Sequence, residues 1–294
     1  MIQTTRIVAV GALLLWSMTV AAQELVHFPS FEDNGPGRSS TVLNGYLSRP
    51  RGEGQHPAVI FLHGCGGLFV GSMIGRLFST IEPGESGWAG ELTRRGYAVL
   101  MVDSFTPRDR REMCAPQTSD PVLYRNRARD AYGALLFLQT QPFVRPDRIG
   151  IMGWSQGGGA LLFAIDTQSF SRPAQLPRGD FRAAVAFYPT SCAERLQPSW
   201  STTIPLMVLI GAEDVGIPWV PCKALLDGAV TRDAKVEMQV YPGAYHHFDW
   251  PNFPRRELPF PTAGGVVRIE GTDTVAGQDA FSRVPSFLDR FLMN

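Results

Sequence analysis

The sequence predicts a single α/β domain in which helices flank a mostly parallel sheet. Apolar runs of strand length alternate with helix-like segments along the chain. Several of these runs are continuously apolar, as is typical of parallel strands that are covered on both faces. Without its first 22 residues the chain still has about 270 residues, which is enough for one large core, and no internal repeat divides it.

The elements follow one another in a regular order. A polar, Gly-rich entry carries a hairpin pattern over residues 35–51. Buried strands are expected at residues 58–62, 97–102, 149–152, 183–188, 206–210 and 236–241. Helices are expected at residues 88–95, 123–139, 158–165, 220–226 and 280–292. A Pro- and Gly-rich segment over residues 251–274 separates the last strand from the closing helix.

The charge balance argues against two classes of partner. Lys and Arg together number 27, Asp and Glu together also number 27, and neither sign forms a long run. Nucleic acid and anionic membrane surfaces are therefore not expected partners. The four cysteines include no C-x-x-C pair, so a structural metal site is not expected either.

The first 22 residues have the pattern of a secretory signal peptide. Arg6 precedes an apolar stretch over residues 7–20, and the small residues Ala21 and Ala22 follow it. Cleavage after Ala22 would leave a domain of residues 23–294 in the periplasm or outside the cell. The alternative is a retained membrane anchor, but the stretch is shorter than the about 20 residues that a spanning helix needs.

Residues 153–157, Gly-Trp-Ser-Gln-Gly, have the pattern and the position of a nucleophile elbow. They follow the apolar run 149–152 and open the helix expected at 158–165. At such a strand-to-helix turn the nucleophile is held on a strained backbone, and flanking glycines relieve the crowding. Ser155 is therefore the candidate nucleophile, and the backbone N–H of Gln156 is a candidate oxyanion donor.

A serine nucleophile needs a base and a carboxylate that orients the base. In the α/β-hydrolase architecture these partners follow the serine in the order acid, then histidine. Asp214 lies four residues beyond the strand 206–210, and His246 follows the strand 236–241. Glu213 is the alternative acid and His247 the alternative base, because each is adjacent to the favoured residue.

The segment 63–67, His-Gly-Cys-Gly-Gly, follows the first buried strand and resembles the H-G-G-G type of oxyanion loop. Glycines in this loop let the backbone approach a substrate carbonyl closely. The second oxyanion N–H is expected from Gly64 or Cys65. His63 is expected to hydrogen-bond within the loop rather than to act as an acid or base.

The helix expected at residues 123–139 contains three arginines at alternate positions. Arg125, Arg127 and Arg129 could bind an anionic substrate. A solvated helix face with local pairing to Asp130 is the favoured interpretation.

With segments 64–67, 103–105, 148–150, 153–157, 211–214 and 241–248 in register, the chain resembles the dienelactone hydrolase family of α/β-hydrolases over roughly residues 40–290. The resemblance implies an eight-stranded sheet, and it implies Ser155, Asp214 and His246 as nucleophile, acid and base. Two residues after His246 stands Phe248, as in the closing motif of the family. Dienelactone hydrolases proper use a cysteine nucleophile and a glutamate on the oxyanion loop, whereas this chain has serine and Leu62-His63 there.

The expected function is hydrolysis of a carboxylic ester or related acyl bond of a small molecule through an acyl-enzyme. Neither a cofactor nor a metal is implied. The same residues could instead transfer the acyl group to an alcohol or cleave a peptide bond. A binding protein without catalysis on the hydrolase fold is the third alternative. The sequence gives no indication of the natural substrate or of the oligomeric state.

The hydrolase sheet also implies a pairing for the four cysteines. In that sheet the strands ending at residues 62 and 102 are neighbours, as are the strands ending near residues 188 and 210. Loops at the carboxyl ends of neighbouring parallel strands lie side by side. The expected disulfides are therefore Cys65–Cys114 and Cys192–Cys222, which suits an exported protein.

Overall fold

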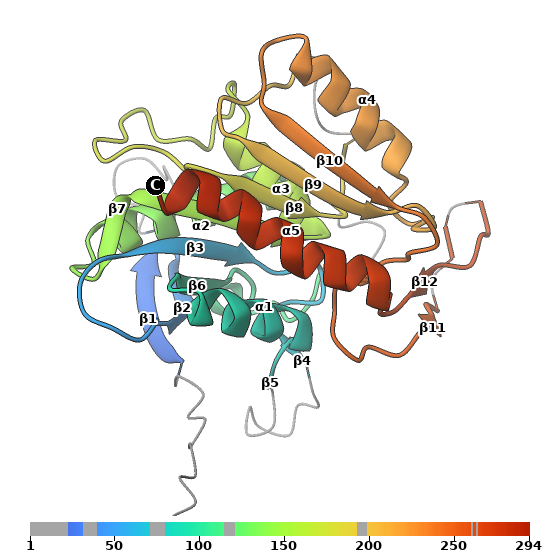
Figure 1. Cartoon of the computed structure of the whole chain (residues 1–294), viewed down its shortest axis with the longest axis horizontal. Helices are drawn as coiled ribbons and strands as arrows, with labels where there is room; N and C mark the ends of the chain where they lie inside the picture. Colours follow the sequence, from blue (N-terminus) through green and yellow to red (C-terminus); the bar gives the residue numbers. More distant parts are fainter. Residues whose placement is uncertain are drawn as a thin grey trace, which may run out of the picture.

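The computed structural model describes residues 23–31, 40–70, 80–114, 121–192, 199–259, 261–262 and 264–294. Its centre is an eight-stranded sheet in the order β1-β2-β6-β3-β7-β8-β9-β10 (Figure 1). The strands are β1 (Glu24–Pro29), β2 (Val42–Ser48), β3 (His56–Leu62), β6 (Ala98–Asp103), β7 (Val144–Trp154), β8 (Ala184–Phe187), β9 (Leu206–Gly211) and β10 (Val236–Tyr241). The first 22 residues, with the expected signal peptide, lie outside the described residues.

The sheet is parallel from β6 to β10, and only β1 and β2 run antiparallel to their neighbours. The predicted mostly parallel sheet is thus confirmed. Every residue of β6, β8 and β9 is buried, which explains why these strands have continuously apolar runs. The antiparallel hairpin begins at Glu24, earlier than the sequence pattern indicated.

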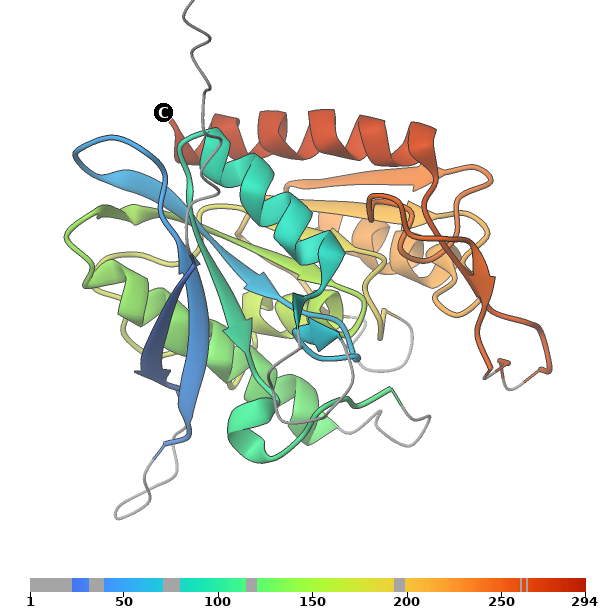
Figure 2. The same ribbon diagram turned by 90° about the horizontal axis from the view of Figure 1, so that it is seen from below.

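Helices cover both faces of the sheet, as Figure 2 shows. On one face lie α1 (Pro83–Arg94) and α5 (Thr274–Leu292), and on the other lie α2 (Pro121–Gln139) and α3 (Gln156–Ile165). The helix α4 (Trp219–Val230) connects β9 to β10 and packs on β10. No helix among the described residues is long and apolar enough to cross a membrane.

Two helices begin earlier than their apolar patterns predicted. The closing helix α5 starts at Thr274 rather than at residue 280, because the Asp273 side chain accepts the Ala276 N–H and caps it. Helix α1 starts at Pro83, and proline is favoured in the first turn because it has no N–H to leave unpaired. Both extra turns lie toward the carboxyl edge of the sheet.

Between β10 and α5 the chain makes the excursion that its Pro and Gly content indicated. It contains the short antiparallel strands β11 (Arg256–Glu257) and β12 (Ile269–Glu270). The chain after β12 returns to the sheet edge, where the Gly271 N–H donates to the His246 carbonyl at 2.9 Å. This return brings Glu270 next to the loop that follows β10.

Candidate active site

The carboxyl ends of the parallel strands border a cavity of about 730 Å³. Loops after β3, β7, β8, β9 and β10 contribute to its walls, together with the excursion between β10 and α5. Ser155, Gln156 and His246 all line it, as do Gly64, Cys65 and His247. These six sequence-predicted residues therefore come together from the three loops after β3, β7 and β10.

Ser155 sits at the turn from β7 to α3 on a strained backbone, with φ 52° and ψ −114°. The flanking glycines are sterically required there. A Cβ on Gly157 would lie 2.0 Å from the Leu62 carbonyl oxygen, and one on Gly153 would lie 2.5 Å from the Gly157 oxygen. The serine is thus held at the end of the strand, on the wall of the cavity.

Asp214 and His246 lie in direct contact, with His246 Nδ1 donating to Asp214 Oδ2 at 2.5 Å. The other carboxylate oxygen of Asp214 accepts the N–H groups of Gly216 and Ile217 at 3.1 and 3.0 Å. These hydrogen bonds fix the orientation of the Asp214 carboxylate. Because Nδ1 of His246 carries the proton, its Nε2 is the free acceptor. Glu213, the alternative acid, is exposed.

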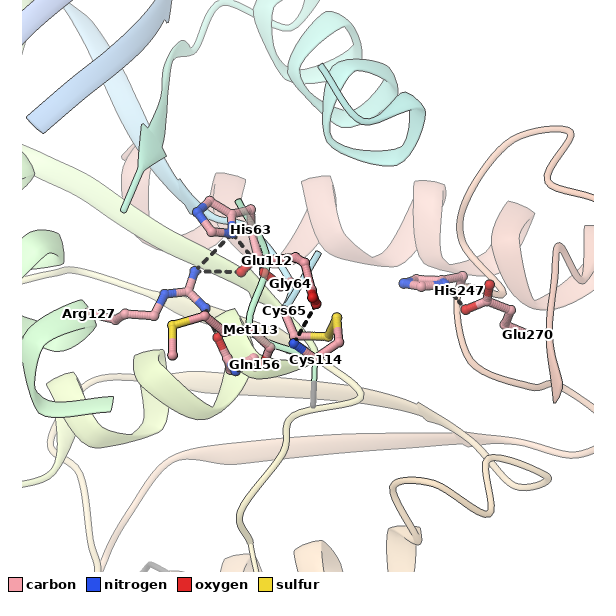
Figure 3. Close-up of a disulfide and its surroundings, with 10 residues drawn as sticks. All are labelled: His63, Gly64, Cys65, Glu112, Met113, Cys114, Arg127, Gln156, His247 and Glu270. Carbon is pink, nitrogen blue, oxygen red and sulfur yellow. Dashed lines mark hydrogen bonds and ion pairs between the residues drawn. A yellow bond between two sulfur atoms is a disulfide. The ribbon is translucent and has the colours of Figure 1, made fainter. Parts of the chain in front are cut away.

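His247 pairs with a different carboxylate, since its Nδ1 donates to Glu270 Oε2 at 2.9 Å (Figure 3). Arg256 donates to the other oxygen of Glu270 at 2.6 Å. Burial, reinforced by the neighbouring His246, lowers the pKa of His247 to about 4 in spite of Glu270. Although burial opposes it, hydrogen bonding and charge from His247 and Arg256 lower the pKa of Glu270 to about 2.

The structure does not join Ser155 to His246 by a hydrogen bond, although both are described and both line the cavity. Contacts of this kind are often long until substrate is bound. The ring of Tyr188 packs on His246 with the ring centres 4.3 Å apart, which limits the orientations of the imidazole.

The oxyanion side of Ser155 is formed by Gln156 and the loop after β3. Gln156 is the first residue of α3, so its N–H has no acceptor within the helix. Burial raises the pKa of the Glu85 carboxyl well above its usual range, and the nearby charge of Glu82 reinforces the effect. Gly64 and Cys65 both line the cavity, so both remain candidates for the second donor.

His63 is buried and held on both ring nitrogens. Its Nδ1 donates to the Gly64 carbonyl at 2.7 Å, and its Nε2 accepts the Ser104 N–H at 3.3 Å. Burial and the charge of Arg127 hold the pKa of His63 well below its usual range. The ring is therefore neutral, and it fixes the loop as the sequence pattern indicated.

The three arginines of α2 do not share a solvated face. Arg125 is exposed and Arg129 is half-buried, but Arg127 is 1% exposed. Its guanidinium lies over the ring of Phe105 at 5.1 Å and donates to the His63 carbonyl at 2.5 Å. The solvated-face interpretation is wrong for Arg127, because residue 127 precedes Ala131 by one helical turn and continues the apolar face of the helix.

Both disulfides are present with the pairing that the sheet order implied. Cys65 joins Cys114 and Cys192 joins Cys222, with Cα separations of 4.9 and 4.8 Å. All four cysteines line the cavity. Disulfides of this kind persist in oxidising compartments such as the periplasm.

Asp249 is a buried carboxylate behind the site that no sequence signal indicated. Its oxygens accept the Trp88 and Trp154 indole N–H groups, each at 2.9 Å, and the Tyr188 hydroxyl at 2.7 Å. Through these bonds it fixes the neighbour of the candidate nucleophile and the ring that packs on His246. Within the described ranges no group of three or more His, Cys, Asp or Glu side chains could hold a metal ion.

Comparisons of the whole chain with known proteins point to one family. The model of the dienelactone hydrolase family matches residues 43–292. A Bradyrhizobium protein named as a 2-oxo-3-(5-oxofuran-2-ylidene)propanoate lactonase is 26% identical over 218 residues, which cover 69% of this chain and 77% of that protein. YtaP of Bacillus subtilis (strain 168), named as a hydrolase, is 30% identical over 129 residues. That match covers 40% of this chain and spans less than half, 43%, of YtaP.

A solved structure with the same fold is the dienelactone hydrolase-like promiscuous phosphotriesterase P91 from metagenomic libraries. It is 18% identical, with a TM-score of 0.63, and the alignment covers 92% of this chain and 99% of that chain. At this identity the likeness shows the fold alone.

Proposed function

Because the chain belongs to the dienelactone hydrolase family and is an ester-bond hydrolase, we propose that it cleaves carboxylic esters through an acyl-enzyme formed on Ser155. The observation that carries this proposal is the contact between His246 and the fixed carboxylate of Asp214, on the wall of a cavity that Ser155 also lines. A nucleophile, a base and an orienting acid are the three groups that this chemistry requires.

In the proposed reaction Ser155 Oγ attacks the ester carbonyl carbon while His246 Nε2 takes the hydroxyl proton. Asp214 keeps His246 in the Nδ1–H tautomer and stabilises the imidazolium. As the tetrahedral intermediate collapses, the bond to the alcohol oxygen breaks and His246 returns the proton to the departing alcohol. Water then attacks the acyl-serine with the same base, which releases the carboxylic acid and restores Ser155.

The negative charge on the carbonyl oxygen needs N–H donors that are already in position. The proposal assigns these donors to Gln156 and, on the loop after β3, to Gly64 or Cys65, all of which line the cavity. The strained conformation of Ser155 supports it, because that conformation places the serine at the start of α3 with the free N–H of Gln156 next to it.

Two departures bear on the substrate. The nucleophile position holds serine, and Leu62-His63 stands where dienelactone hydrolases proper have a glutamate. The proposed substrate is therefore a small-molecule ester in general rather than a dienelactone, and the cavity of about 730 Å³ has the size of a small-molecule site. The two disulfides and the sequence of residues 1–22 support a periplasmic or secreted location.

The test is labelling with a fluorophosphonate together with hydrolysis of p-nitrophenyl esters of varied chain length. We expect one label per chain, located on Ser155. Ser155→Ala should lose the label and at least about 10³-fold in kcat while its melting temperature stays unchanged, since only the attacking atom is removed. Retained hydrolysis in Ser155→Ala would exclude this nucleophile. Product analysis with an added alcohol separates hydrolysis from acyl transfer, and a peptide substrate tests for peptidase activity.

A further inference from the structure

Arg127 is a fully buried cation with no ion pair among the described residues. Its guanidinium donates to two uncharged acceptors, the carbonyl of His63 at 2.5 Å and the side-chain oxygen of Gln156 at 3.1 Å. The carboxylate nearby on the same helix, Asp130, is bound by Arg108 at 2.7 Å. Nε of Arg127 is buried and has no partner in the described part of the chain.

The contacts of Arg127 close a ring of interactions around the oxyanion side of the site (Figure 3). The amide nitrogen of Gln156 donates to the Met113 carbonyl at 3.1 Å. The Met113 N–H in turn donates to the Cys65 carbonyl at 2.7 Å. The chain from Cys65 back to His63 completes the ring, and the adjacent disulfide joins Cys65 to residue 114.

We propose that Arg127 is a positioning residue for ester hydrolysis, which holds the loop after β3 and the first residue of α3 at the separation that the oxyanion requires. This inference rests on the proposed function. The backbone N–H groups assigned to the oxyanion belong to Gln156 and to Gly64 or Cys65, and Arg127 connects the two segments that carry them. The guanidinium also places a positive charge next to the Gln156 side chain and the His63 carbonyl.

Stability alone does not account for this arrangement. A buried charge that no carboxylate contacts directly costs free energy, although Asp130 favours the charged form, and an apolar side chain of similar volume would avoid the desolvation. Burial lowers the pKa of Arg127 to about 10, so the side chain stays protonated at neutral pH. A fixed cation in a poorly solvated place interacts favourably with the negative charge that develops on the carbonyl oxygen, and it needs no reorganisation.

The experiment compares Arg127→Met, Arg127→Lys and the control Arg125→Met in the full chain. Arg125 lies on the same helix but is exposed. For a p-nitrophenyl ester, Arg127→Met should lower kcat by about 10- to 100-fold with KM changed by less than about threefold, because misplaced oxyanion donors act on the transition state. Arg127→Lys should recover part of kcat, and Arg125→Met should match the wild type.

The readouts are kcat per fluorophosphonate-titrated site and the melting temperature. An Arg127→Met enzyme with a lowered melting temperature but wild-type kcat per titrated site would overturn the proposal, because the arginine would then act only on stability. If Arg127→Met does not fold, Gln156→Met opens the same ring from the other side, and an unchanged kcat there would overturn the proposal equally. A wild-type chain that takes no label and cleaves no ester would instead refute the proposed function.

Discussion

Two adjacent histidines in this protein each donate through Nδ1 to a buried carboxylate, yet their surroundings differ. His246 binds Asp214 at 2.5 Å, and that carboxylate is held by backbone N–H groups. His247 binds Glu270 at 2.9 Å, and that carboxylate is also bound by Arg256. The two imidazole rings are 4.4 Å apart.

The difference shows that a histidine–carboxylate contact does not by itself identify a catalytic base. Asp214 has no cation as a partner in these contacts, so its negative charge is available to stabilise an imidazolium on His246. Glu270 already has Arg256 as a cationic partner, and burial lowers the pKa of His247 to about 4. Its φ of 60° marks a left-handed turn, and its ring stacks on Trp250 with the centres 4.0 Å apart. We therefore expect the second pair to stabilise the turn that presents His246.

The largest expected effect separates the two histidines. His246→Ala should lower kcat for a p-nitrophenyl ester by at least about 10⁴-fold, because the serine then has no base. His247→Ala should lower it by less than about tenfold. Fluorophosphonate labelling rates for both variants provide a second measurement. If His247→Ala proved the more damaging of the two, the base would be His247.

Substitution of Asp214 should likewise be more damaging to kcat than substitution of Glu270. Asp214→Asn should lower kcat by about 10³- to 10⁴-fold, because an amide stabilises the wrong imidazole tautomer, as it does in serine proteases. Glu270→Gln keeps the shape of its side chain and should cost less than about tenfold. The test is to measure kcat of both variants near pH 7 and to confirm that their melting temperatures are the same. Equal losses in both variants would mean that both pairs contribute to the chemistry.

The His247–Glu270 pair should affect how the free energy of unfolding depends on pH. His247 has a folded-state pKa of about 4, below the ordinary histidine value, so between about pH 6.5 and 4 the unfolded chain binds more protons than the folded one. The free energy of unfolding should therefore fall as the pH falls through this window, by up to about 3 kcal/mol from this group. Urea unfolding should show a shallower decline in His247→Gln. Identical pH slopes in variant and wild type would refute the assigned state of His247.

Much of the fold could be predicted because the relevant signals are local. Continuously apolar runs marked the buried strands, and glycines around Ser155 marked the turn at which no Cβ fits. The spacing of Asp214 and His246 after their strands indicated that they would meet. The choice between Asp214 and Glu213 could not be made locally, because one residue of a turn decides which carboxylate points inward.

The residues that the sequence did not indicate depend on contacts between distant segments. Glu270 is the last residue of β12, and it contacts His247 because the chain returns to the sheet edge there. Asp249 meets two indoles from α1 and β7. Arg127 did have a signal, because it stands one turn before Ala131 on the apolar face of α2. A charged residue in that position is usually taken as the edge of the face, and only the acceptors at His63 and Gln156 explain its burial.

The smallest expected effect concerns Arg256, and it tests whether the second pair is separate from the chemistry. The Arg256 side chain is 61% exposed although its partner Glu270 is buried, so water screens the pair. Arg256→Met should lower the free energy of unfolding by no more than about 1 kcal/mol and should leave kcat unchanged. The Glu270 pKa should rise, since a cation that favours the carboxylate is lost. A tenfold fall in kcat would contradict this, because it would mean that charge changes at Glu270 pass through His247 to His246. Measuring kcat and urea unfolding on the same preparation separates the two outcomes.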